Sequence, residues 1–101
     1  MTVLGRVVAA ALDAAREAVR AGSAGEWERR APPVEYVRHA GPVTMVAHPM
    51  HDAPAVLDCS VRLSVWVALD GGGRLLVAAI YAATIAEARA IGDRLLAAEM
   101  N

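Results

Sequence analysis

The spacing of hydrophobic positions changes twice along the chain. Over residues 3–21 the larger apolar side chains recur every three or four residues, which is typical of one face of a helix. Over residues 61–69 the spacing becomes two, with Val61, Leu63, Val65, Val67 and Leu69 on one face. From residue 85 the helical spacing returns. The pattern therefore predicts a helix at each end and strands between them.

Local signals define the ends of the two predicted helices. Thr2 is placed to cap the first helix, and Gly22 is placed to stop it. The stretch Thr84-Ile85-Ala86-Glu87 has the T-x-x-E pattern of a capping box, in which both side chains accept hydrogen bonds from free backbone N–H groups. We therefore expect the second helix to open at this stretch.

The region between the first helix and residue 54 contains several glycines and prolines, which interrupt regular structure. It predicts a connector at residues 22–33, followed by two short strands at 34–38 and 43–47. Residues 40–42 form the turn between these strands, and residues 48–54 form a loop after them. Within the connector, Trp27 is the expected anchor against the body of the protein.

A second hairpin follows, and it contains the longest strands. Its turn is Asp70-Gly71-Gly72-Gly73, because glycine accepts positive φ without steric cost. Residues 74–83 then form a strand whose two faces are both apolar. Such a strand is typically central in its sheet or covered on both sides.

These elements predict one α+β domain over residues 1–101. We expect two layers, with an antiparallel sheet of three to four strands and both helices packed on one face (α-β-β-β-β-α). A chain of this size buries only about 60–70% of the surface that its unfolded form exposes, so its core is thin. Association with another copy or with a partner would enlarge it.

The second face of the sheet is the main candidate for a functional surface. The period of two places an apolar set there, consisting of Trp66, Ala68, Leu76, Ala78 and Ile80, or the alternate residues of the last strand if the register falls otherwise. An open apolar patch that includes a tryptophan is typical of an interface. We expect a homodimer or a protein partner to cover it, and the alternative is that residues 22–60 fold back over it.

The charges argue against nucleic acid and membrane partners. Ten basic and eleven acidic residues give a net charge of −1 and no basic stripe, whereas nucleic-acid binding needs clustered cations. The apolar run at residues 7–12 is too short for a signal peptide or a membrane span. Cys59 is the single cysteine, which fits a reducing compartment. We therefore predict a soluble, cytoplasmic protein.

Residues 46–52, VAHPMHD, hold the best candidates for a metal site, namely His48, His51 and Asp52. Imidazole and carboxylate groups are ligands for zinc and related metals. On a loop, however, a spacing of three does not fix geometry, and no HExxH or CxxC pattern accompanies it. Metal binding is therefore an alternative hypothesis beside a solvated histidine loop, and no cofactor is predicted.

No catalytic set is evident. Cys59 has His48 and His51 as possible bases, but the adjacent carboxylate of Asp58 opposes formation of a thiolate. The glycines at residues 71–73 are followed by neither the lysine nor the helix of a phosphate-binding loop. We therefore do not expect an enzyme.

The order helix, strands, helix resembles the double-stranded RNA-binding domain in outline. That family implies a basic cluster at the start of the last helix, where this chain has Thr84, Ile85, Ala86 and Glu87. Nucleic-acid binding on this layout is a further alternative. The first hypothesis is a small non-catalytic interaction or assembly protein of the chaperone, inhibitor or immunity, or phage-assembly type.

Overall fold

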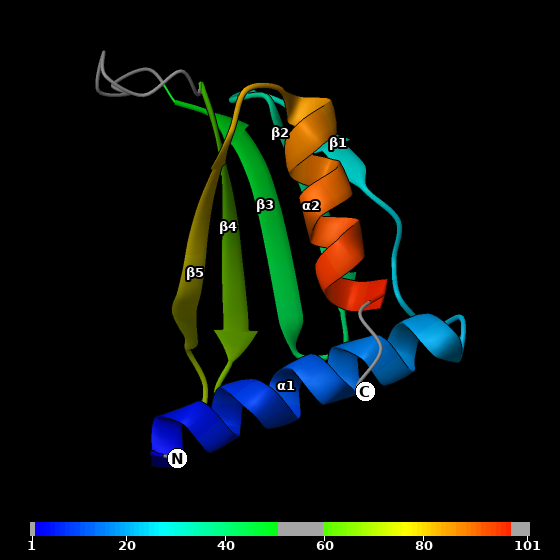
Figure 1. Ribbon diagram of the computed structural model, residues 1–101, viewed down its shortest axis with the longest axis vertical. Helices are drawn as coiled ribbons and strands as arrows, with labels where there is room; N and C mark the ends of the chain where they lie inside the picture. Colours follow the sequence, from blue (N-terminus) through cyan, green and yellow to red (C-terminus); the bar gives the residue numbers. More distant parts are fainter. Residues whose placement is uncertain (1, 51–59, 98–101) are drawn as a thin grey trace.

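The computed structural model describes residues 2–50 and 60–97, and within them it contains two helices and a five-stranded antiparallel sheet (Figure 1). The helices are α1, Val3–Arg20, and α2, Ile85–Ala97. The strands are β1 Glu28–Arg30, β2 Glu35–Ala40, β3 Val43–Pro49, β4 Val61–Ala68 and β5 Arg74–Ala82. The predicted α+β architecture is confirmed, with one strand more than expected.

The sheet follows chain order, β1-β2-β3-β4-β5, so each strand pairs with its neighbours in sequence. The additional strand β1 lies inside the predicted connector, and its three residues are all charged and exposed. It therefore carries no apolar alternation from which a strand could be predicted. Within the described residues the last strand is neither central nor covered on both faces, because β5 lies at the edge of the sheet and its Leu76 and Tyr81 are exposed.

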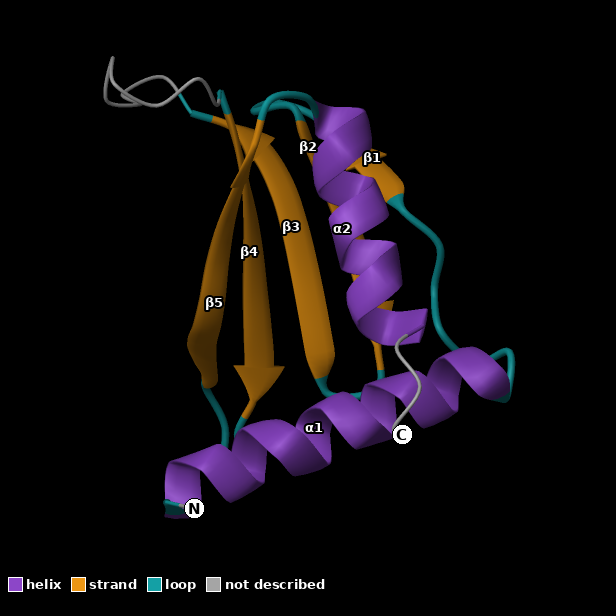
Figure 2. Ribbon diagram, in the orientation of Figure 1, coloured by secondary structure: helices purple, strands orange, loops and turns teal. Residues whose placement is uncertain are grey.

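The two helices lie on one side of the sheet and leave the other side open (Figure 2). α2 packs across β3, β4 and β5, whereas α1 runs along the ends of the strands and contacts α2, β2 and β3. The core between these layers is built mainly from small and aliphatic side chains, including Ala11, Ala15, Met45, Leu63, Val65, Val67, Ala88 and Leu96.

Both predicted helix starts are confirmed. The Thr2 hydroxyl accepts a hydrogen bond from the Gly5 N–H at 2.9 Å. The Thr84 hydroxyl accepts from the Glu87 N–H at 3.1 Å, and the Glu87 carboxylate accepts from the Ala83 N–H at 3.2 Å. These side chains satisfy N–H groups that have no partner within their helices.

Two glycines permit close contacts between elements. Gly41, at φ +52°, brings the β2–β3 turn against α1, and a Cβ there would lie 3.2 Å from the Ala14 carbonyl oxygen. Gly92 brings α2 against the connector and the sheet. A Cβ at this position would lie 2.9 Å from Trp27 Cζ2 and 3.0 Å from Met45 Sδ. The glycine in the middle of the predicted last helix is therefore needed for packing.

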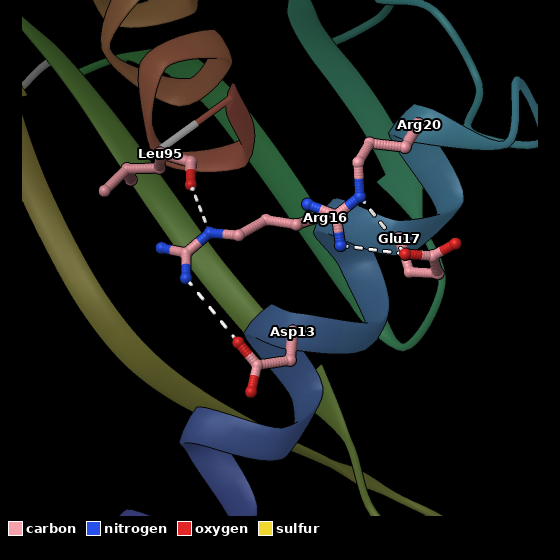
Figure 3. A network of polar contacts seen from close by, with 5 residues as sticks. All are labelled: Asp13, Arg16, Glu17, Arg20 and Leu95. Atoms are coloured by element: carbon pink, nitrogen blue, oxygen red, sulfur yellow. Dashed lines mark hydrogen bonds and ion pairs between the residues drawn. The ribbon is translucent and has the colours of Figure 1, made fainter. Parts of the chain in front are cut away.

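The two helices are also linked by a polar contact (Figure 3). Arg16 of α1 donates from Nε to the carbonyl oxygen of Leu95, 3.1 Å away in the last turn of α2, and lies 3.8 Å from Asp13. Carbonyls in the last turn of a helix lack intrahelical partners and attract positive charge. Arg16 thus satisfies the end of α2, while the neighbouring pair Glu17 and Arg20 is exposed.

Trp27 anchors the connector, as predicted. Its indole Nε1 donates to Asp93 Oδ1 at 2.8 Å, and Arg38 Nη1 donates to the same oxygen at 2.7 Å. Arg38 Nε also donates to the Gly25 carbonyl at 2.9 Å. Asp93 therefore joins α2 to β2 and to the connector through one carboxylate.

Replacing Asp93 with alanine is expected to lower the free energy of unfolding by about 1–2 kcal/mol, because it removes the acceptor from the indole of Trp27 and from the partly buried Arg38. Asp93→Asn retains an acceptor oxygen and is expected to cost less. Urea unfolding followed by circular dichroism measures both effects, with the exposed Glu26→Ala as the control. An Asp93→Ala midpoint equal to that of the wild type would contradict the role of this carboxylate.

Candidate functional site

The open side of the sheet is hollowed into a groove of about 850 Å³, which we call the sheet groove. Its floor is formed by residues of β2, β3 and β4 that point away from the helices. Val37 and Ser64 in this floor are each only 2% exposed, although no helix covers them. The curvature of the sheet and the flanking side chains therefore provide a sheltered surface.

Two kinds of side chain line the sheet groove. One set is apolar and consists of Pro33, Val34, Val37, Val46, Pro49 and Trp66. The other set carries imidazole or guanidinium groups and consists of Arg30, His39, His48, Arg62 and Arg74. Glu35 is the one carboxylate among the described lining residues, so the groove combines apolar contact with an excess of cationic groups.

Arg62 lies at one end of the groove, opposite His48 in the β3–β4 register. Its Nε donates to the hydroxyl of Ser64 at 3.1 Å, which fixes the guanidinium against the floor. Among residues 2–50 and 60–97, no carboxylate lies within 4.0 Å of it. Its remaining donors form a planar fork suited to a carboxylate or phosphate group.

Trp66 and Arg74 lie toward the other end. The Arg74 guanidinium carbon lies over the indole ring of Trp66, 4.7 Å from its centroid, in a cation–π contact. Nearby, His39 Nδ1 and the Thr44 hydroxyl are 3.0 Å apart, and Thr44 is paired with Trp66. The contact with the Trp66 ring keeps the charge of Arg74 beside the groove.

The charge is unevenly distributed along the groove. Arg30 lies 3.7 Å from Glu28 and is paired across the ladder with Glu35, so two carboxylates offset it. Arg62 and Arg74 have no such partner among the described residues. Trp66 lies four positions after Arg62, which corresponds to about 13 Å along a strand. The groove therefore presents two uncompensated cations with an apolar strip between them.

The predicted interface set is placed only in part on this face. Trp66, Ala68 and Leu76 point away from the helices, but Ala78 and Ile80 pack on the helix-covered side. The reason is a β-bulge. Trp66 pairs with Leu76 while Val65 pairs with Ala78, so one extra residue in β5 reverses the alternation. The face also differs from the expected apolar patch, because arginine and histidine side chains share it with Trp66.

The predicted metal ligands are only partly described. His48 belongs to β3 and not to a loop, because the strand extends to Pro49. It faces the groove opposite Arg62, whose fixed positive charge disfavours a cation beside this imidazole. His51, Asp52 and the candidate nucleophile Cys59 lie outside the described residues. Within the ranges 2–50 and 60–97, no three His, Cys, Asp or Glu side chains gather closely enough to hold a metal ion.

Comparisons with known proteins add no assignment. The chain matches no protein-family model, and searches of curated proteins and of solved structures return no match. Neither described helix combines the length and apolar character needed to cross a bilayer. At the start of α2, where a double-stranded RNA-binding domain would be basic, the Glu87 carboxylate caps the helix.

Sequence reasoning missed most of the sheet groove. The signal for Arg62, Ser64 and Trp66 was present, because they alternate with the buried face of β4. Arg30 was missed because β1 has no apolar alternation, and His39 was missed because β2 is longer than predicted. His48 was named as a metal ligand but was assigned to a loop, because β3 is also longer than predicted. The balanced composition also concealed the gathering of three arginines, Arg30, Arg62 and Arg74, on one face of the sheet.

Proposed function

We propose that this protein is a small non-catalytic binding protein whose sheet groove takes an acidic segment of a protein partner. The observation that carries this proposal is the pair of uncompensated cations, Arg62 and Arg74, on either side of a sheltered apolar floor. An extended acidic peptide supplies both kinds of contact, since its alternate side chains point into the groove. Bidentate arginine–carboxylate pairs would set its register.

The shape of the surface favours such an extended ligand over a second copy packed face to face. Two hollowed faces placed against each other would enclose space instead of interdigitating, whereas stable interfaces reach the packing density of protein interiors. A two-fold contact would also bring arginines of the two grooves toward one another. The homodimer expected for this face is therefore the less favoured occupant.

The lining also favours polypeptide over nucleic acid. Sequence-tolerant binding of single strands uses several stacking aromatic rings along a strongly positive channel. The groove contains one aromatic ring, Trp66, and Arg74 already covers part of it. Its Val37 and Val46 floor suits an aliphatic side chain between two acidic ones. These features support an acidic, partly apolar segment.

The proposal predicts binding of a capped peptide with the sequence Ser-Glu-Ser-Val-Ser-Glu-Ser, in which both glutamates and the valine share one face. Titration followed by ¹⁵N NMR is expected to shift the indole signal of Trp66 and leave that of Trp27 unchanged, with a dissociation constant below about 1 mM. Arg62→Glu is expected to weaken binding at least tenfold, because it replaces a cation with an anion. The matched Arg94→Glu, on the exposed surface of α2, is expected to bind like the wild type.

Two controls, one peptide and one oligonucleotide, decide the class of ligand. A peptide with lysine in place of both glutamates is expected not to bind, and equal affinity for the two peptides would contradict charge recognition. Single-stranded oligothymidylate is expected not to bind at 150 mM salt. If it shifts Trp66 with a steep salt dependence while the acidic peptide does not, the partner is a nucleic acid and the proposal is wrong.

A further inference from the structure

The two edges of the sheet differ in how they are protected. β1 is three residues long and consists of Glu28, Arg29 and Arg30, which is typical of an edge that resists pairing. β5 is nine residues long, and after Arg74 it contains no charged residue and no proline up to Ala82. No strand among the described residues pairs with its outer side. The backbone donors and acceptors along this β5 edge are therefore available to another strand.

Exposed apolar side chains gather around the same edge. Seven large hydrophobic residues are exposed in the described chain, and Val34 is the one that lies at the opposite end of the sheet. The other six belong to β5, to the residue that follows β4, or to the first turns of α1, and they are Leu76, Tyr81, Leu69, Val3, Leu4 and Val7. Scattered exposed hydrophobic residues are ordinary, but a gathering of this kind marks an interaction surface.

The first turn of α1 extends past the β5 edge. Ala14 lies against the β2–β3 turn, and α1 runs from there across the strand ends toward β5 (Figure 1). The distance from that turn to β5 is about 12 Å at the usual strand spacing, which is about eight residues of helix. Val3 and Leu4, which are 78% and 54% exposed, therefore lie beyond the edge.

We infer that a second copy of this chain pairs with the β5 edge, antiparallel and about a two-fold axis, to form one continuous sheet. Beyond the bulge, Ala78–Ala82 is regular and uncharged, so it is complementary to itself. With the axis at Ile80, Ala79 lies opposite the partner's Tyr81, and no like charges meet. Both helix layers then lie on one side, and both sheet grooves remain open on the other.

The test introduces charges at the residues that face each other across the predicted strand pair. Size exclusion with light scattering at 100 µM then measures the mass of the protein in solution. The wild type is expected at twice the 10.6 kDa of one chain. Ala79→Lys combined with Tyr81→Lys is expected to be monomeric, because two lysines then face each other on each side of the axis. Ala79→Lys combined with Tyr81→Glu is expected to restore the dimer, since opposite charges then face each other. Val34→Lys is the control on the opposite end of the sheet and is expected to remain dimeric.

Hydrogen exchange gives a second measurement that needs no variant. The amides within residues 78–82 that point to the outer edge are expected to be protected at 100 µM and to exchange faster at 0.5 µM, while those of β3 do not change. A wild type that is monomeric at 100 µM overturns the inference. So does a dimer that the double lysine variant leaves intact, or one whose β5 amides exchange equally at both concentrations. None of these outcomes depends on peptide binding in the sheet groove.

Discussion

Leu63→Ala is expected to lower the free energy of unfolding by about 2–5 kcal/mol, the largest effect of any single substitution that we predict. Leu63 is 0% exposed and lies in the middle of β4, paired with Ala47 on one side and Ile80 on the other. Its neighbour Ala47 is small and cannot fill the space that the lost methyl groups leave. Since domains of this size have only about 5–15 kcal/mol of stability, this loss is a large fraction of the total.

The matched control is Leu76→Ala, the same chemical change at a residue that is 40% exposed on the face of β5 that points away from the helices. It is expected to cost less than about 1 kcal/mol at protein concentrations where the chain is monomeric. Guanidinium unfolding of both variants, monitored by circular dichroism, compares them directly. Equal losses of unfolding free energy at the two positions would contradict the expectation that burial beneath the helices sets the contribution of a leucine to stability.

Gly92→Leu is expected to destabilise the protein by about 3 kcal/mol, because the new side chain must occupy space already filled by Trp27 and Met45. Met45 is fully buried and the Trp27 ring is held by its hydrogen bond to Asp93, so neither can move away without loss. Gly92→Ala is expected to cost less, since the gain in helix propensity, about 1 kcal/mol, offsets part of the steric overlap.

The control for this position is Ala90→Leu, which adds the same bulk to the exposed side of α2 two residues away. It is expected to change the free energy of unfolding by no more than about 0.5 kcal/mol. Thermal and urea unfolding of both variants gives the difference. If Gly92→Leu were as stable as Ala90→Leu, the close approach of α2 to Trp27 would not constrain the packing.

The fold class was predictable because each main element has its own local signal. The spacing of two predicted one face with five residues, Val61, Leu63, Val65, Val67 and Leu69. The first four are buried, whereas Leu69 follows the end of β4 and is exposed. The T-x-x-E stretch predicted the start of α2, and its hydrogen bonds are present. These signals depend on residues that are close in sequence. They therefore predict the local structure whatever the arrangement of the elements.

The edges of the sheet and the faces of β5 were not predictable in the same way. Strand order depends on which strands pair, and the three charged residues of β1 gave no hint of pairing. The bulge shifts every later residue of β5 by one position, so counting by twos assigned Ala78 and Ile80 to the wrong face. The sheet groove was missed for a related reason, since its lining comes from all five strands, whose register cannot be read from the sequence.

The pairing of every strand with its neighbour in sequence has a consequence for how the chain reaches this structure. Each ladder of the described sheet closes by a short link or by one connection of moderate length, so the entropy lost in forming it is small. The contacts that join distant parts are those of α2, where Arg16 and Leu95 are 79 residues apart and Trp27 and Asp93 are 66 apart. Low sequence separation within the sheet favours fast formation of hairpins, and we expect the docking of α2 to follow them.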